Sequence, residues 1–159
     1  MNSQLTSASP IGIFDSGLGG LTVLKTLKIL FPNESFIYFG DTANVPYGNK
    51  SNEQVIQYSN NILKFFTTQN TKAVVMACNT ASSVAYNKLN NIYKFPIFDV
   101  VTPSVNYAIE ISKTKKICVI GTNSTINSKA YSNALKKLNN NCSITEIACP
   151  LFVPIIEEG

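Results

Sequence analysis

The 159-residue sequence contains no histidine, no arginine and no tryptophan, so all 13 of its basic residues are lysines. Without histidine there is no imidazole to act as a general base or to join a His-based metal site. Without arginine, a carboxylate or phosphate ligand must be held by backbone N–H groups, hydroxyls, amides or lysine. We therefore expect no metal site, and we expect any acidic ligand to be bound mainly by neutral donors.

Charged residues make up only 14% of the chain, and the formal net charge is +4. The lysines are scattered, and the densest group is Lys113, Lys115 and Lys116. Proteins that bind nucleic acids usually gather positive charge on one face and favour arginine, which pairs with phosphates and bases. We therefore expect no nucleic-acid partner.

Long hydrophobic runs are absent as well. No apolar run approaches the ~20 residues that a membrane-spanning helix needs. Residues 1–10 are rich in Ser, Thr and Asn, without the basic cluster and apolar segment of a secretory signal. These features predict a soluble cytoplasmic protein with no membrane partner.

The four cysteines never form a C-x-x-C pair, which argues against a zinc knuckle or a thioredoxin-type motif. An even number of cysteines without a signal peptide is weak evidence for disulfides, so free thiols are expected. We interpret Cys118, Cys142 and Cys149 as inert, buried small hydrophobic residues.

The sequence does contain a regular alternation of short apolar runs and helical periods. Strands are expected at residues 11–14, 35–39, 73–76, 97–100, 117–120 and 143–147. The runs are continuously apolar, which is typical of parallel strands covered on both faces by helices. The predicted fold class is therefore α/β, built as parallel-sheet αβα sandwiches.

The expected helices lie between these strands. Leucines at helical spacing predict a helix from Leu21, and a capping box at residues 51–54 opens another. A third follows residue 76 and runs to about residue 89. Thr102 and Pro103 read as the N-cap and first residue of a fourth helix, and a single helix is expected over residues 125–138.

Polar residues follow the strands, where parallel α/β sheets bind their ligands. The loop Asp15-Ser16-Gly17-Leu18-Gly19-Gly20 follows the first strand and matches neither a dinucleotide-binding fingerprint nor a P-loop. A tight turn and a ligand-binding loop are both consistent with it. The turn at residues 45–48 is either a simple Pro/Gly turn or a source of backbone N–H groups and a phenol for an anion.

Cys78 differs from the other cysteines because it stands where the third strand gives way to a helix. A helix start stabilises a thiolate and lowers the pKa of the thiol, whereas a nearby Asp15 carboxylate would raise it. The sequence does not decide the balance. A reactive thiol and an inert buried one both remain open from position alone.

Several of these segments together resemble glutamate racemases of the aspartate/glutamate racemase family. The resemblance rests on residues 11–23, 38–48, 77–82, 120–122 and 148–154, which follow one another in the family's order. It implies a cofactor-independent isomerase that interconverts L- and D-glutamate and supplies D-glutamate for peptidoglycan. It also implies two α/β domains, here residues 1–98 carrying Cys78 and residues 99–159 as a partial second domain.

In the family, one cysteine thiolate removes the α-proton of glutamate and a second thiol protonates the opposite face. By resemblance, Cys78 is the first acid/base cysteine, and Asp15 is a catalytic neighbour close to the substrate ammonium. The implied substrate contacts are Asp15 and Ser16 near the ammonium, Asn79 and Thr80 at the α-carboxylate, Tyr47 and Gly48 at the side-chain carboxylate, and Thr122 and Glu157 from the second domain. The expected partners are glutamate and, as an option, a second copy of the chain in a homodimer.

The sequence departs from the family pattern because the Gly-Cys-Thr-His motif of the second cysteine is missing. Residues 150–159 read as the start of a helix, so the chain looks like the N-terminal portion of a racemase that cannot racemise efficiently alone. Three alternatives stay open: an aspartate or hydantoin racemase, a non-catalytic module that binds a carboxylate or nucleotide, and an inactive structural fragment.

Overall fold

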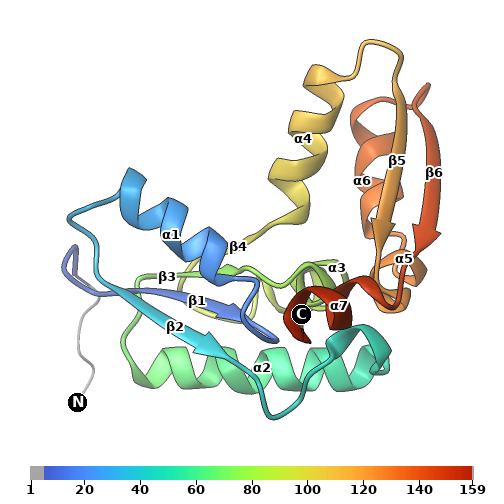
Figure 1. The fold of residues 1–159 in the computed structure, drawn as a ribbon. Coiled ribbons are helices and arrows are strands. Elements are labelled where there is room, and N and C mark those ends of the chain that lie inside the picture. Colours follow the sequence, from blue (N-terminus) through green and yellow to red (C-terminus); the bar gives the residue numbers. More distant parts are fainter. Residues whose placement is uncertain (1–5, 159) are drawn as a thin grey trace.

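The computed structural model describes residues 6–158, and the side chains of residues 6–156. Strands and helices alternate along the chain (Figure 1). The strands are β1 (Ile11–Asp15), β2 (Phe36–Gly40), β3 (Ala73–Met76), β4 (Ile97–Asp99), β5 (Lys116–Gly121) and β6 (Ser143–Ala148). The helices are α1 (Leu21–Leu30), α2 (Asn52–Thr68), α3 (Asn79–Leu89), α4 (Val101–Ile111), α5 (Asn123–Asn127), α6 (Ala130–Leu138) and α7 (Phe152–Glu158), with a 3-10 turn η1 (Tyr47–Asn49).

The first four strands form one parallel sheet in the order β2-β1-β3-β4. Helix α1 lies on one side of this sheet and α2 on the other (Figure 1). Because all four strands are parallel, their carboxyl ends share one edge of the sheet, and the loops after β1 and β3 meet there. The predicted α/β class is confirmed.

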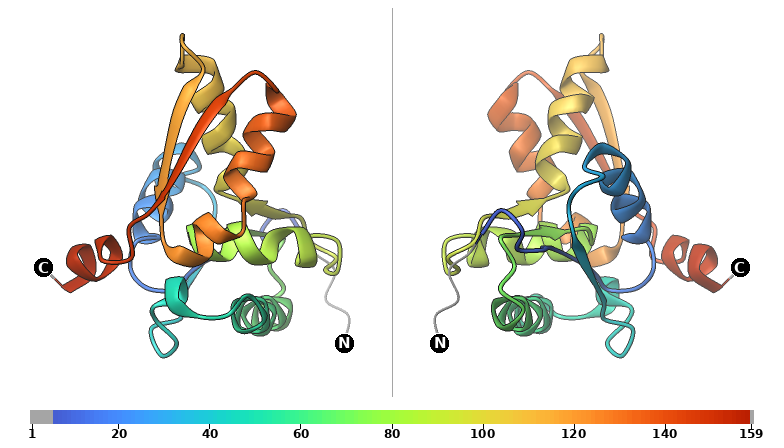
Figure 2. Two further views of the ribbon diagram at one scale, coloured as in Figure 1. Left: turned by 90° about the vertical axis from the view of Figure 1, so that its right-hand side faces the viewer. Right: turned by 90° about the vertical axis from the view of Figure 1, so that its left-hand side faces the viewer.

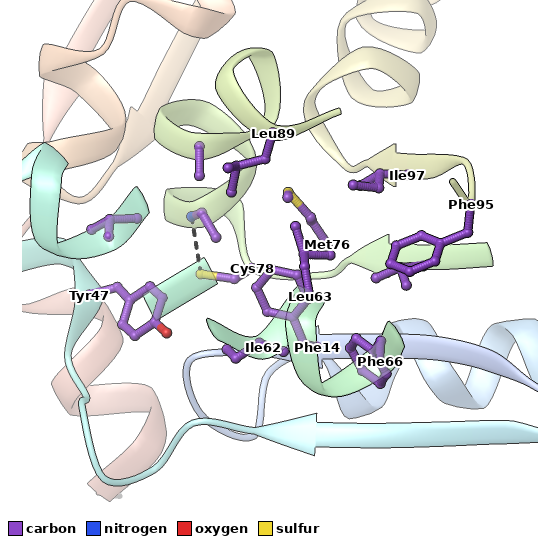
Figure 3. Close-up of a cluster of buried hydrophobic side chains, with 14 residues drawn as sticks. Phe14, Tyr47, Ile62, Leu63, Phe66, Met76, Cys78, Leu89, Phe95 and Ile97 are labelled. Atoms are coloured by element: carbon purple, nitrogen blue, oxygen red, sulfur yellow. Dashed lines mark hydrogen bonds between the residues drawn. The ribbon is translucent and has the colours of Figure 1, made fainter. Parts of the chain in front are cut away.

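The main hydrophobic core lies between this sheet and helices α2 and α3 (Figure 3). Phe14 and Met76 from the sheet and Leu63 and Phe66 from α2 are all fully buried in it. Cys78 sits at the border of this cluster, where β3 leads into α3. The core therefore fixes the strand-to-helix junction that carries the candidate thiol.

Strands β5 and β6 form a second, two-stranded parallel sheet. Val119 and Leu135 are central to a smaller core in which α4 and α6 cover one face of this sheet. On its other face, Ile120 and Ile147 are exposed among the described residues. The expectation of helices on both faces is therefore wrong for this sheet within residues 6–158.

Two helix boundaries differ from the prediction. Helix α4 begins at Val101, with Val100 as its N-cap, and not after Thr102. Asp99, just before the N-cap, binds its first turn: Asp99 Oδ1 accepts from the Thr102 backbone N–H at 2.7 Å, and Asp99 Oδ2 from the Thr102 hydroxyl at 2.8 Å. The single helix expected over residues 125–138 is broken into α5 and α6, because Lys129 adopts a left-handed conformation with φ of 57°. The predicted capping box of α2 is confirmed, with Ser51 and Gln54 bonded in both directions.

The two sheets meet through α3, α5 and η1 (Figures 1 and 2). The Ser124 hydroxyl in α5 donates to the backbone carbonyls of Gly48 at 2.9 Å and Lys50 at 3.1 Å. These bonds tie the start of α5 to the turn that follows β2. As a result, the loops after β1, β2, β3 and β5 surround one space.

Gly12 in β1 provides a test of the packing between the first sheet and α2. A Cβ atom at Gly12 would lie 2.7 Å from Cδ1 of Phe66, whose ring is fully buried and cannot move aside. We expect Gly12→Ala to lower the free energy of unfolding by about 1–3 kcal/mol, measured by urea denaturation. Gly19→Ala is the matched control, because its Cβ would meet only Asp15 Oδ2 at 3.6 Å; equal losses in both variants would contradict this account.

Candidate active site

Cys78 is the N-cap residue of α3, and its side chain is almost fully buried, with 5% exposed. Its sulfur accepts a hydrogen bond from the backbone N–H of Ala81 at 3.4 Å, drawn as a dashed line in Figure 3. The thiol in turn donates to Ser16 Oγ at 3.5 Å. The sulfur is thus held between the start of a helix and the loop after β1.

The loop after β1 is organised by the carboxylate of Asp15. Asp15 Oδ2 accepts from the backbone N–H groups of Gly17 at 3.2 Å and Gly20 at 3.0 Å. Tyr38 from β2 donates its hydroxyl to the carbonyl of Gly17 at 3.0 Å. A buried carboxylate is therefore fixed next to the thiol, at the carboxyl end of the neighbouring strand.

These groups face a cavity of about 460 Å³ that is lined from both sheets, a size within the range of small-molecule sites. Eight of the nine site residues named from the sequence line it: Asp15, Ser16, Tyr47, Gly48, Cys78, Asn79, Thr80 and Thr122. The ninth, Glu157, lies in α7, and its side chain is outside the described residues. The structure thus gathers the candidates in one place, while their roles in binding remain predictions.

Three threonine hydroxyls join the two sheets at the cavity. Thr80 Oγ1 lies 3.0 Å from Thr122 Oγ1 and 3.3 Å from Thr125 Oγ1, and the last two lie 3.0 Å apart. Thr122 also caps α5 by accepting from the backbone N–H of Thr125 at 3.2 Å. A hydroxyl can donate and accept, so this triangle can turn donors toward an acidic ligand.

The turn at residues 45–48 approaches the second sheet very closely. A Cβ atom at Gly48 would lie 2.6 Å from Cβ of Thr122, so only glycine fits at this contact. The Tyr47 side chain, by contrast, points into the core with 1% exposed, and its hydroxyl donates to Asp41 Oδ2 at 2.6 Å. The Tyr47 hydroxyl is therefore already paired with a buried carboxylate, although the residue also lines the cavity, and its contact with an anion stays a prediction.

Opposing effects act on the pKa of Cys78, and burial is the largest of them. Burial and the negative charge of Asp15 raise this pKa to about 11, against hydrogen bonds from Ala81 and Ser16 that lower it. The balance that the sequence left open therefore favours a protonated thiol at neutral pH. Cys78 is therefore a proton donor at neutral pH, and a positive charge placed nearby would lower its pKa and favour the thiolate.

The other three cysteines differ from one another. Cys142 is buried, as predicted, and its thiol donates to the carbonyl of Lys115 at 3.1 Å. Cys118 is exposed, because its side chain lies on the uncovered face of the second sheet, so the predicted burial is wrong. Cys149 is half-buried and lines the cavity, which also departs from the prediction.

The sequence reasoning missed three polar residues of the second sheet's helices that line the cavity: Ser104, Thr125 and Tyr131. Thr125 could have been found, because it follows Thr122 by the three-residue spacing of an N-cap contact. Tyr131 had no sequence signal, because its position depends on the break at Lys129.

Across the part of the chain that the structure describes, no group of His, Cys, Asp or Glu side chains could hold a metal ion. Over the same residues, no helix combines the length and the apolar character that crossing a membrane requires.

The protonation state of Cys78 can be tested by alkylation. With a pKa of about 11, about one Cys78 thiol in a thousand is ionised at pH 8, so alkylation by iodoacetamide should be slow and rise about tenfold per pH unit. Asp15→Asn removes a like charge, lowers the pKa and should speed alkylation at pH 8. Peptide mapping by mass spectrometry gives the rate, and exposed Cys118 is the internal reference. A slower rate in Asp15→Asn would refute the electrostatic role of Asp15.

The structural role of Tyr47 can be tested by Tyr47→Phe. The change removes the hydroxyl donor of Asp41, a carboxylate that is only 8% exposed, and should cost about 1–3 kcal/mol of unfolding free energy. Urea denaturation measures the loss. Tyr107→Phe, at a tyrosine that is 62% exposed, is the control and should be neutral; an unchanged Tyr47→Phe would show that the bond adds nothing.

Comparisons with known proteins point to one family. The Asp/Glu/Hydantoin racemase family model matches residues 22–159. The glutamate racemase of Sulfurihydrogenibium sp. (strain YO3AOP1) is 50% identical over 151 residues, which cover 94% of this chain and 58% of that protein. The glutamate racemase of Aquifex aeolicus (strain VF5) is 48% identical over 149 residues, with the same two shares.

Solved structures give the same result. Glutamate racemase isoform RacE1 from Bacillus anthracis superposes with a TM-score of 0.92 at 36% identity, over 95% of this chain and 57% of that one. The glutamate racemase from Francisella tularensis subsp. tularensis SCHU S4, solved in complex with D-glutamate, has a TM-score of 0.91 at 42% identity, over 97% and 58%. The chain thus spans somewhat more than half the length of these relatives. Since the family model covers all but the first 21 residues, the chain belongs to the Asp/Glu/hydantoin racemase family.

Proposed function

We propose that this chain carries the Cys78 half of a glutamate racemase active site, in which Cys78 exchanges a proton with the α-carbon of glutamate. The observation that carries the proposal is the shared cavity, where the Cys78 sulfur faces the same space as Asp15 and the polar residues of both sheets. A thiol is a suitable group because it can be a base as thiolate and an acid as thiol.

The ammonium group of the substrate would allow a thiol with so high a pKa to become a base. Burial and the Asp15 charge keep Cys78 protonated in the free site. The ammonium group of a bound amino acid would place a positive charge near both groups. It would offset the repulsion from Asp15 and lower the pKa of the thiol. The thiol would then release its own proton to solvent, and the thiolate would form next to the α-proton that it removes.

The substrate carboxylates would be bound by neutral donors. We assign the α-carboxylate to Asn79 and Thr80 at the start of α3, and the side-chain carboxylate to the backbone at Gly48. Proton removal shifts negative charge onto the α-carboxylate, so fixed donors at its oxygens lower the barrier. Thr122, held by its bonds to Thr80 and Thr125, completes this set from the second sheet.

Further parts of the proposal come from the resemblance to the family. They are a reaction without a cofactor, a second thiol on the opposite face of the α-carbon, a role in supplying D-glutamate for peptidoglycan, and a cytoplasmic location. We also propose the division into residues 1–98 and 99–159 and a homodimer as one assembly of the complete protein. Cys149 lines the cavity but lacks the sequence context of the family's second cysteine.

An aspartate or hydantoin racemase is the alternative, because the family model covers all three substrates in its description. The relatives at 48–50% identity are named glutamate racemases, which favours glutamate. Exchange of the α-proton in D₂O, measured with aspartate and with hydantoins as well as with glutamate, separates these substrates. If aspartate or a hydantoin exchanged its α-proton faster than glutamate, that compound and not glutamate would be the substrate.

The role of Cys78 is tested by exchange of the α-proton in D₂O, followed by ¹H NMR on each enantiomer of glutamate. With one acid/base thiol, we expect deuterium to enter one enantiomer with its configuration retained. Cys78→Ala should lower that exchange at least about 100-fold, because it removes the general base. Cys118→Ala, at the exposed cysteine, should leave it unchanged. Normal exchange in Cys78→Ala would disprove the role of this thiol.

A further inference from the structure

Asn79 has a partner that the proposed reaction does not yet use. It is the first residue of α3, it is exposed at the cavity, and its side-chain Oδ1 accepts a hydrogen bond of 2.5 Å from the hydroxyl of Tyr131. Tyr131 belongs to α6, on the other sheet, and lines the same cavity. The bond therefore crosses from one half of the structure to the other at a predicted ligand contact.

The direction of this hydrogen bond matters for an acidic ligand. A carboxamide carries one acceptor arm and one donor arm, and rotation by half a turn exchanges them. With Oδ1 held by a hydroxyl that donates, the Nδ2 arm is the one left to face a ligand. If the amide turned around, its oxygen would face the carboxylate and repel it.

Tyr131 is well placed to hold this direction. Its half-buried ring packs against the second hydrophobic core with Leu135, so the hydroxyl has a fixed position. Burial raises the pKa of Tyr131. A hydrogen bond from Ser104 opposes this rise and the charge of Asp99 adds to it, so the phenol stays protonated and donates. The left-handed Lys129 is the N-cap of α6, two residues before Tyr131, and therefore sets where the Tyr131 ring lies.

We propose that Tyr131 is a positioning residue that fixes the Asn79 carboxamide with its N–H₂ group toward the α-carboxylate of the substrate. This rests on the proposed function, in which Asn79 binds that carboxylate. Tyr131 contacts Asn79 and not the reacting atoms. The contribution of Tyr131 to binding affinity is therefore specific to ligands that carry a carboxylate on the α-carbon.

A purely structural bridge between the sheets would behave differently. The hydroxyl pair of Thr80 and Thr122 already links the same two halves at 3.0 Å. If Tyr131 only stabilised this contact, its loss would loosen the whole cavity and weaken every ligand. The two roles are therefore separated by comparing ligands with and without the α-carboxylate.

The experiment compares D-glutamate with 4-aminobutyrate, which keeps the amine and the distal carboxylate but lacks the α-carboxylate. Binding to the purified chain is followed by NMR titration. We expect Tyr131→Phe to weaken D-glutamate binding about three- to tenfold and to leave 4-aminobutyrate unchanged. In an Asn79→Ala background, Tyr131→Phe should have no further effect, because the group that it positions is gone. Tyr107→Phe on α4, 62% exposed, is the matched control and should bind both ligands normally.

A second measurement needs no ligand. The side-chain N–H₂ group of Asn79 should give two sharp, restrained amide signals in the ¹⁵N-labelled chain and become mobile in Tyr131→Phe. Unchanged amide dynamics, equal weakening of both ligands, or additive losses in the double variant would each overturn the proposal. A chain that binds no glutamate while the amide responds as expected would refute the proposed function and the substrate role of Tyr131, but retain its hold on Asn79.

Discussion

A buried thiol lies beside a buried carboxylate at the edge of the first sheet, and the rest of the site is arranged around this pair. Two acidic groups close together in a poorly solvated space cannot both be ionised at low cost. Burial raises the pKa of Cys78, and so does the charge of Asp15, whose carboxylate accepts from the backbone N–H groups of Gly17 and Gly20, so the thiol keeps its proton. A cation that entered this space would offset the repulsion from Asp15, so the pKa of the thiol would respond to a positively charged ligand.

The second sheet determines the width of the space in front of this pair. The contact between Gly48 and Thr122 leaves no room for a side chain, so the turn after β2 and the start of α5 touch through backbone and methyl groups. Ser124 fixes the same contact by bonding to two carbonyls of that turn. The cavity is thus bounded by a steric limit as well as by hydrogen bonds, and a shift of α5 would change both the opening and the donor geometry.

The local patterns of the sequence predicted the six strands, the α/β class and the position of Cys78, because strand ends and helix starts are set by neighbouring residues. Features that depend on how side chains pack in the folded chain were not predictable in this way. The left-handed Lys129 interrupts an apolar period that reads as one helix, and Tyr47 turns inward because Asp41, six residues earlier, accepts its hydroxyl. Likewise, the exposure of Cys118 depends on which face of its sheet is covered. The pKa of Cys78 is a balance of burial against hydrogen bonds, and burial is known only once the core is built.

The absence of arginine and histidine explains why so many contacts at this site serve orientation. A guanidinium attracts a carboxylate through its charge, which acts over a distance and tolerates small errors in position. A hydroxyl or an amide attracts only along the direction of its hydrogen atom, and it repels when it presents an oxygen. A site of neutral donors must therefore hold each donor with a partner of its own, as Thr125 does for Thr122 and Tyr131 does for Asn79. Because both pairs depend on helices of the second sheet, the proposed binding of an acidic ligand by residues of the first sheet would depend on the contact between the two halves.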